Sequence, residues 1–178
     1  RQAQAARDAL RHVPFDLAVH SGLPRTRETA EIVLAASAGA PRPVAEPGLE
    51  ELKSGWLVAD SREELAARLA FCFDAAAEPG ARFLPDGETF AGAQARIVEA
   101  MEQLIVTRVW RTALIVAHEG VNRIVLGWAS KGGLATIGAF EQDLCCVNVI
   151  DVDVTPAESG EGLQIERAIL KAVNVTPY

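Results

Sequence analysis

Apolar residues along the chain follow two spacings, which predicts helices that alternate with short strands. Apolar positions three or four residues apart mark one face of a helix, and they recur in residues 1–12, 24–36, 61–77, 89–106 and 120–128. In the longest of these helices the apolar face comprises Phe90, Ala93, Ile97, Met101 and Leu104. Short apolar runs, typical of strands, lie at 16–20, 43–46 and 112–117.

This order of elements predicts an α/β fold in which helices cover both faces of a sheet. The run from Thr112 to Ala117 is apolar without alternation, as expected of a strand that is covered on both faces. Residues 146–154 and 163–170 flank a turn-rich segment, which favours an antiparallel hairpin. We therefore expect one domain over residues 1–178, a three-layer α/β/α sandwich with a mainly parallel sheet and an antiparallel edge hairpin.

Composition narrows the class of protein. The 178 residues are 49% hydrophobic and carry a net charge of −7, which suits one folded domain and argues against a nucleic-acid binder. No apolar run approaches the ~20 residues of a membrane span. The three cysteines, Cys72, Cys145 and Cys146, form neither a disulfide framework nor a metal motif, so we expect a reducing, cytoplasmic compartment. Arginine far outnumbers lysine, which suggests a bacterial gene of high GC content.

Two predicted strands end in residues that can bind an anion. In an open α/β sheet, ligands lie beyond the carboxyl ends of the strands. The first strand is followed by Ser21 and a helix whose first turn contains Arg25, and a guanidinium at a helix N-terminus binds phosphate well. The later strand ends at His118, a candidate general acid, nucleophile or phosphate partner. The alternatives are a solvated surface arginine and a core histidine that bonds to the backbone.

Acidic residues in a loop supply a candidate proton donor. Glu50 and Glu51 follow a Pro-Gly turn, and a carboxylate in a partly apolar loop can have a raised pKa. Such acidic pairs are otherwise simply solvated. The segment Gly87-Glu88-Thr89 is interpreted as the start of a helix.

Taken together, these segments resemble the phosphoglycerate mutase-like family of the histidine phosphatase superfamily. The matching pieces occur in the family's order: RQAQAARDAL, SGLPRTRETA, LEELKSG, GETFAGAQAR and ALIVAHEGVNR. The resemblance implies that Arg25 binds the phosphoryl group, that Glu51 donates a proton, and that His118 is a cationic second histidine on the phosphoryl oxygens. It places Ser21 at the pocket edge in a supporting role, and it implies no cofactor and no metal.

One element of the family pattern is missing. The family's nucleophile is a histidine in an Arg-His-Gly motif on the first strand, and this sequence has no such motif. Neither His12 nor His20 lies in a matching segment. The first residue is Arg1 rather than Met, so we expect the parent chain to carry this strand upstream, and we expect the chain as printed to be inactive.

The resemblance predicts a phosphomonoesterase that forms a phosphohistidine intermediate on a small phosphorylated metabolite. A phosphoglycerate mutase is one alternative, which the short stretch between Glu51 and Gly87 disfavours because a mutase needs a lid that excludes water. A non-catalytic phospholigand- or protein-binding domain on the same fold is another. Accidental matches would instead leave Arg25, Glu51 and His118 far apart. A homodimer that pairs through the edge strand from Leu163 to Leu170 is possible.

Overall fold

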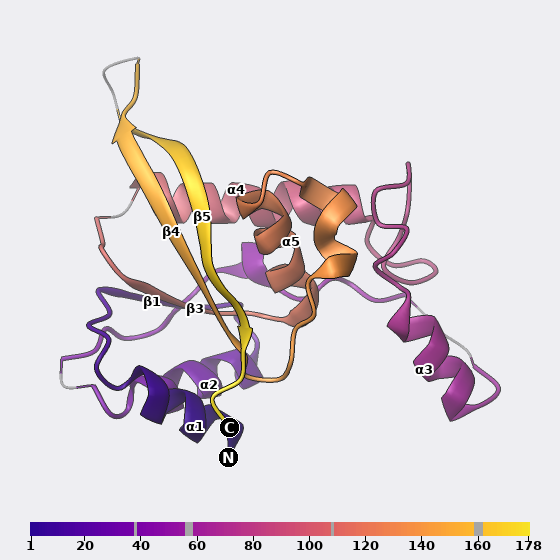
Figure 1. Ribbon diagram of the computed structural model, residues 1–178, viewed down its shortest axis with the longest axis horizontal. Coiled ribbons are helices and arrows are strands. Elements are labelled where there is room, and N and C mark those ends of the chain that lie inside the picture. The colour runs from indigo at the N-terminus through magenta and orange to yellow at the C-terminus, as the bar shows by residue number, and fades with distance from the viewer. Residues whose placement is uncertain (38, 56–58, 108, 159–161) are drawn as a thin grey trace.

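The computed structural model describes residues 1–37, 39–55, 59–107, 109–158 and 162–178 (Figure 1). Its helices are α1 (Gln2–Leu10), α2 (Pro24–Leu34), α3 (Arg62–Ala70), α4 (Phe90–Thr107) and α5 (Glu119–Ala129). Its strands are β1 (Leu17–His20), β2 (Val44–Ala45), β3 (Ala113–Val116), β4 (Val147–Pro156) and β5 (Leu163–Val175). Two 3-10 turns, η1 (Pro47–Leu49) and η2 (Gly133–Ala139), complete the elements.

A parallel sheet separates two layers of helices, as predicted. The strand order is β2-β1-β3, and both pairings are parallel. Figure 1 shows α1 and α2 on one side of β1 and β3, and α4 and α5 on the other. The predicted apolar face of α4, from Phe90 to Leu104, is buried in the core between the sheet and α5. The three-layer α/β/α prediction is therefore confirmed.

The hairpin is antiparallel, as predicted, but it forms a sheet of its own. β4 and β5 pair with each other along their length, and no described residue of either pairs with the parallel sheet. β5 packs against α4 and α5. The prediction that the hairpin lies at the edge of the main sheet is wrong for the described residues. Pairing of Leu163 to Leu170 across a homodimer stays a prediction.

The strand predicted from Thr112 to Ala117 is less buried than expected. All four residues of β3 are only half-buried, whereas Ala18, Val19 and His20 of β1 are buried. The reason lies in the strand order: among the described residues β3 pairs with β1 along one edge and with no strand along the other. The apolar run from Thr112 to Ala117 therefore forms a strand, but one edge of that strand is unpaired among the described residues.

Two other boundaries differ from the prediction. The helix expected to reach Ala77 ends at Ala70, and turns follow it through Phe73, whose side chain is buried in the core. Ser61 caps this helix as predicted, because its hydroxyl accepts the amide of Glu64. The strand expected to begin at residue 146 begins at Val147, so Cys145 and Cys146 lie just before β4, and both are half-buried. No helix among the described residues is long and apolar enough to cross a membrane.

Candidate active site

The carboxyl ends of β1 and β3 lie side by side and bring two predicted residues into contact. In the parallel pairing His20 is opposite Val116, so the residues that follow both strands meet at one edge of the sheet. Ser21 Oγ and His118 Nε2 are 2.7 Å apart, although 97 positions separate them in the sequence. Both side chains are buried.

Arg25 reaches the same histidine from the first turn of α2. Pro24 occupies the first position of this helix, where its missing N–H costs nothing, and Arg25 follows it. The Nη2 atom of Arg25 is 3.0 Å from Nδ1 of His118. A guanidinium has only donors, so Nδ1 must accept this hydrogen bond through its lone pair.

The remaining hydrogen bonds fix the protonation of His118. Thr26 Oγ1 donates its proton to the carbonyl of Leu23, at 2.9 Å. Ser21 Oγ must therefore donate to Thr26 Oγ1, also at 2.9 Å, and accept from Nε2 of His118. A chain of four bonds thus runs from Arg25 to the backbone, with His118 as the neutral Nε2–H tautomer.

Burial and charge both favour this neutral form. Burial, and after it the positive charge of Arg25, lower the pKa of His118 from 6.5 to about 4. The resemblance implied a cationic His118 bound to the phosphoryl oxygens. Without a ligand, burial and then the guanidinium 3.0 Å away favour the neutral form, and the cationic state beside a phosphoryl group stays a prediction.

Glu51 approaches His118 from the loop that follows η1. Its Oε2 lies 3.8 Å from Nδ1 of His118, and its Oε1 accepts the amide of Leu52 at 3.0 Å. With His118 neutral, this contact is not an ion pair. Burial, opposed by these backbone bonds and by Arg25, raises the pKa of Glu51, and the charge of Glu119 adds to the rise. A carboxyl with a raised pKa that faces the site can hold a proton to donate.

The backbone at the N-terminus of α5 packs closely against Glu51 and restricts its position. The backbone amide of Gly120 faces the carboxylate of Glu51 and lowers its pKa. A Cβ atom at Gly120 would lie 2.8 Å from Cδ1 of Leu52 and 3.0 Å from Oε1 of Glu51. Only glycine therefore leaves room for the carboxyl beside His118.

The structure brings all four predicted residues together: Ser21, Arg25, Glu51 and His118. This convergence argues against accidental matches. Two further residues that shape the site, Thr26 and Gly120, were not predicted. They lie inside the motifs SGLPRTRETA and ALIVAHEGVNR, but a motif does not show which side chains its members contact.

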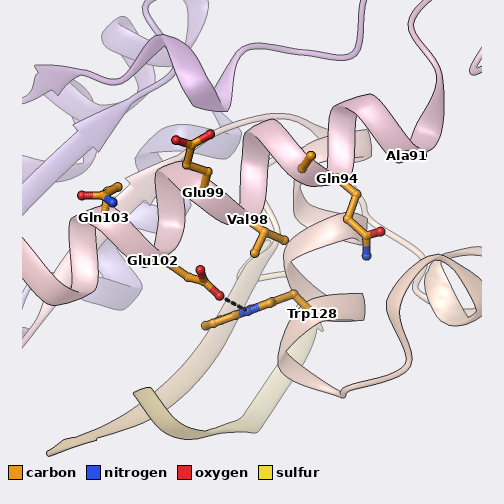
Figure 2. A pocket seen from close by; sticks show the side chains of 8 residues that line it. Ala91, Gln94, Val98, Glu99, Glu102, Gln103 and Trp128 are labelled. Carbon is orange, nitrogen blue, oxygen red and sulfur yellow. Dashed lines mark hydrogen bonds between the residues drawn. The ribbon is translucent and has the colours of Figure 1, made fainter. Parts of the chain in front are cut away.

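A separate groove lies beside α4, at the C-terminal end of α5. Its volume is about 430 Å³, and it runs between α4 and α5 beside Val98, Glu99 and Trp128 (Figure 2). The indole of Trp128 donates to Glu102 across it, at 3.3 Å. Trp128 is near the last residue of α5 and His118 precedes the first, so this groove is not part of the site around Arg25.

Comparison with known proteins now identifies the family. The sequence profile of the histidine phosphatase superfamily (branch 1) matches residues 1–158. The chain belongs to the histidine phosphatase superfamily. It is similar to the adenosylcobalamin/alpha-ribazole phosphatase of Salmonella typhimurium, with 29% identity over 157 residues that make up 85% of this chain and 74% of the relative.

Solved structures of histidine phosphatases share the fold. The alpha-ribazole phosphatase of Shigella flexneri superposes with a TM-score of 0.71 at 24% identity, over 98% of this chain and 81% of that chain. A mycobacterial glucosyl-3-phosphoglycerate phosphatase superposes with a TM-score of 0.76 at 22% identity, over 98% and 85% of the two chains. The resemblance inferred from the motifs is confirmed at the level of superfamily and fold.

Proposed function

We propose that the protein is a phosphomonoesterase that acts through a phosphohistidine intermediate on a small phosphorylated metabolite. The observation that carries the proposal is the meeting of Arg25, His118 and Glu51, which come from three separate segments. A guanidinium, an imidazole and a carboxyl with a raised pKa are the groups that phosphoryl transfer to an alcohol or water requires.

Arg25 and His118 would bind the phosphoryl oxygens. The N-termini of α2 and α5 lie at this edge of the sheet, and the positive ends of their dipoles favour a dianion. A phosphoryl oxygen that enters the site would replace Nδ1 of His118 as the acceptor of the hydrogen bond from Nη2 of Arg25. Without that bond, and beside a negative charge, His118 would gain a proton and donate through both ring nitrogens.

Glu51 would protonate the leaving oxygen as the P–O bond breaks. Burial raises the pKa of Glu51, which favours its protonated form, and its position 3.8 Å from Nδ1 of His118 puts it beside the proposed phosphoryl pocket. The carboxylate that results would then take a proton from the water that hydrolyses the phosphohistidine.

The nucleophile would be a histidine on a strand that precedes Arg1 in the parent chain. The free edge of β3 supports this part of the proposal, since a half-buried apolar strand with one unpaired edge among the described residues can accept a further parallel strand. A histidine at the carboxyl end of that strand would come beside His118. The codons upstream of Arg1 should therefore encode an Arg-His-Gly motif.

We favour a phosphatase over the alternative of a phosphoglycerate mutase. The relative from Salmonella typhimurium is named a phosphatase, and it shares 29% identity over most of this chain. A phosphorylated metabolite of the size of alpha-ribazole phosphate is the substrate class we propose. The three free thiols suit a reducing, cytoplasmic compartment.

The decisive experiment is hydrolysis of p-nitrophenyl phosphate by the full-length protein, with rapid quenching to trap the phosphoenzyme. We expect an acid-labile, alkali-stable phosphoryl group on the upstream histidine and a loss of rate of about 10²-fold or more in Arg25→Ala and His118→Ala. Replacement of the upstream histidine by alanine should abolish the phosphoenzyme. Turnover without a trapped phosphohistidine, or turnover unaffected by these changes, would contradict the proposal.

A further inference from the structure

Arg96 commits its guanidinium to the loop that carries Glu51. It lies in the second turn of α4, and its Nη1 donates to the carbonyls of Gly48 and Glu50, at 2.8 and 3.0 Å. Its Nε and Nη2 donate to the two carboxylate oxygens of Glu88, at 3.1 and 2.8 Å. The side chains of Arg96 and Glu88 are only 25% and 15% exposed.

Glu88 holds the other side of the same loop. Its Oε2 accepts the amide of Lys53 at 3.3 Å, and its own amide donates to the carbonyl of Lys53 at 2.8 Å. Burial alone would raise the pKa of Glu88, but the bonds from Arg96 and the Lys53 amide outweigh it and hold the pKa below its ordinary value. The carboxylate is therefore charged at neutral pH and keeps both of its partners.

Close backbone contacts at Gly48 and Gly55 further restrict the loop that carries Glu51. A Cβ atom at Gly48 would lie 2.5 Å from Cβ of Ala100, so the loop lies directly on α4. Beyond Glu51, a Cβ atom at Gly55 would overlap the carbonyl oxygen of Pro85. The chain is thus held at residues 48 and 50 before Glu51 and at residues 53 and 55 after it.

We propose that Arg96 and Glu88 form one positioning unit for Glu51, which fixes the carboxyl at the distance at which it can protonate the leaving oxygen. This rests on the proposed role of Glu51. General acid catalysis depends on a heavy-atom distance of about 2.6–3.2 Å in the reacting complex. Four hydrogen bonds to the loop backbone, two from Arg96 and two with Glu88, can maintain that distance. A loop without them would let the carboxyl move.

A positioning role differs from a merely structural one in its dependence on the leaving group. p-Nitrophenolate departs without a proton, whereas phenolate is more basic and gains more from general acid catalysis. The ratio of kcat/KM for phenyl phosphate to that for p-nitrophenyl phosphate therefore reports proton donation in the phosphorylation step. Because both values come from one preparation, the ratio is independent of how much of a variant is folded.

The test compares this ratio in the full-length protein and its variants. We expect Arg96→Met and Glu88→Gln each to lower the ratio about 5-fold, Arg96→Lys to lower it nearly as much because an ammonium cannot reach all the acceptors, and the double variant to add little. Glu51→Gln should lower it at least as far. The matched control is Arg27→Met, which removes the exposed pair of Arg27 and Glu31 on α2 and should leave the ratio unchanged.

The outcomes separate the two proposals. A ratio that falls in Glu51→Gln but stays at the wild-type value in Arg96→Met and Glu88→Gln would overturn the positioning unit and leave the proposed function intact. A ratio unchanged in Glu51→Gln would instead reject Glu51 as the proton donor, and the positioning unit with it. Equal losses on both substrates in the Arg96 and Glu88 variants would mark them as structural residues only.

Discussion

The guanidinium of Arg25 donates to Nδ1 of His118 at 3.0 Å, and this bond is incompatible with a proton on that nitrogen. The bond from Nε2 to Ser21 at 2.7 Å requires a proton on the opposite nitrogen. In the ligand-free site the imidazole of His118 is therefore neutral and lies beside the permanent positive charge of Arg25. The imidazole can then accept one more proton when an anion binds.

The first prediction concerns the titration of His118 without ligand. Burial and the charge of Arg25 lower its pKa from 6.5 to about 4, so the unfolded chain binds a proton between these pH values and the native chain does not. Its contribution to stability is full above pH 6.5 and is lost as the pH falls toward 4. Long-range ¹H–¹⁵N NMR should show an Nε2–H tautomer at pH 6. In His118→Gln the stability should depend less on pH in this window, and a midpoint near 6.5 would contradict the hydrogen-bond assignment.

The second prediction concerns proton uptake on anion binding. Orthovanadate or phosphate should raise the pKa of His118, because the anion replaces Nδ1 as the acceptor for Arg25 and attracts a positive charge. Titration calorimetry at pH 6 in two buffers of different ionisation enthalpy should show uptake that approaches one proton. In Arg25→Met the uptake should fall along with affinity. Binding without any buffer dependence would show that the histidine stays neutral.

A third prediction tests the hydroxyl chain. Ser21→Ala removes the acceptor of the His118 Nε2–H and leaves a buried donor unsatisfied, so unfolding by urea should show a loss of about 1–3 kcal/mol. Ser37→Ala is the matched control. The buried Oγ of Ser37 has no hydrogen-bond partner in the described part of the chain, so its removal should leave stability unchanged or raise it slightly. Equal losses in the two variants would contradict the chain of bonds.

The fourth prediction tests the close approach at α5. Gly120→Ala puts a methyl group 2.8 Å from Leu52 and 3.0 Å from the Glu51 carboxyl, so we expect a loss of about 1–3 kcal/mol and a lower kcat/KM for phenyl phosphate. In the control Gly92→Ala, on the exposed face of α4, the new methyl meets only the Thr89 hydroxyl at 3.0 Å. That variant should keep wild-type activity and change stability by less than about 1 kcal/mol. A fully active Gly120→Ala variant would show that the position of the Glu51 carboxyl does not depend on the glycine at residue 120.

The layers of the fold and the meeting of the candidate site residues could be predicted from the sequence because both depend on local patterns. The apolar face from Phe90 to Leu104 and the alternation of helices with strands require no knowledge of distant contacts. Arg25 and His118 follow strands, and parallel strands place their carboxyl ends together. The motif order then selected Glu51 over Glu50.

What the sequence could not predict depends on contacts between distant segments. An apolar run such as Leu114 to Val116 is the same in a central strand and in one with a free edge, so its half-burial was not predictable. The helix ending at Ala70 stops early because Phe73 turns into the core, against the helix preference of the alanines that follow. The neutral state of His118 needs the position of Arg25, 93 residues away.

The contact between Gly55 and Pro85 has a consequence for how this chain can vary. The backbone on either side of the intervening segment therefore meets at one point in space. Within that segment Phe73 and Ala76 are buried in the core, whereas the turn from Ala77 to Gly80 is exposed. Residues inserted in this turn would add only about 0.6 kcal/mol of closure entropy for each doubling of its length, so the surface near the site can change while Glu51 keeps its place.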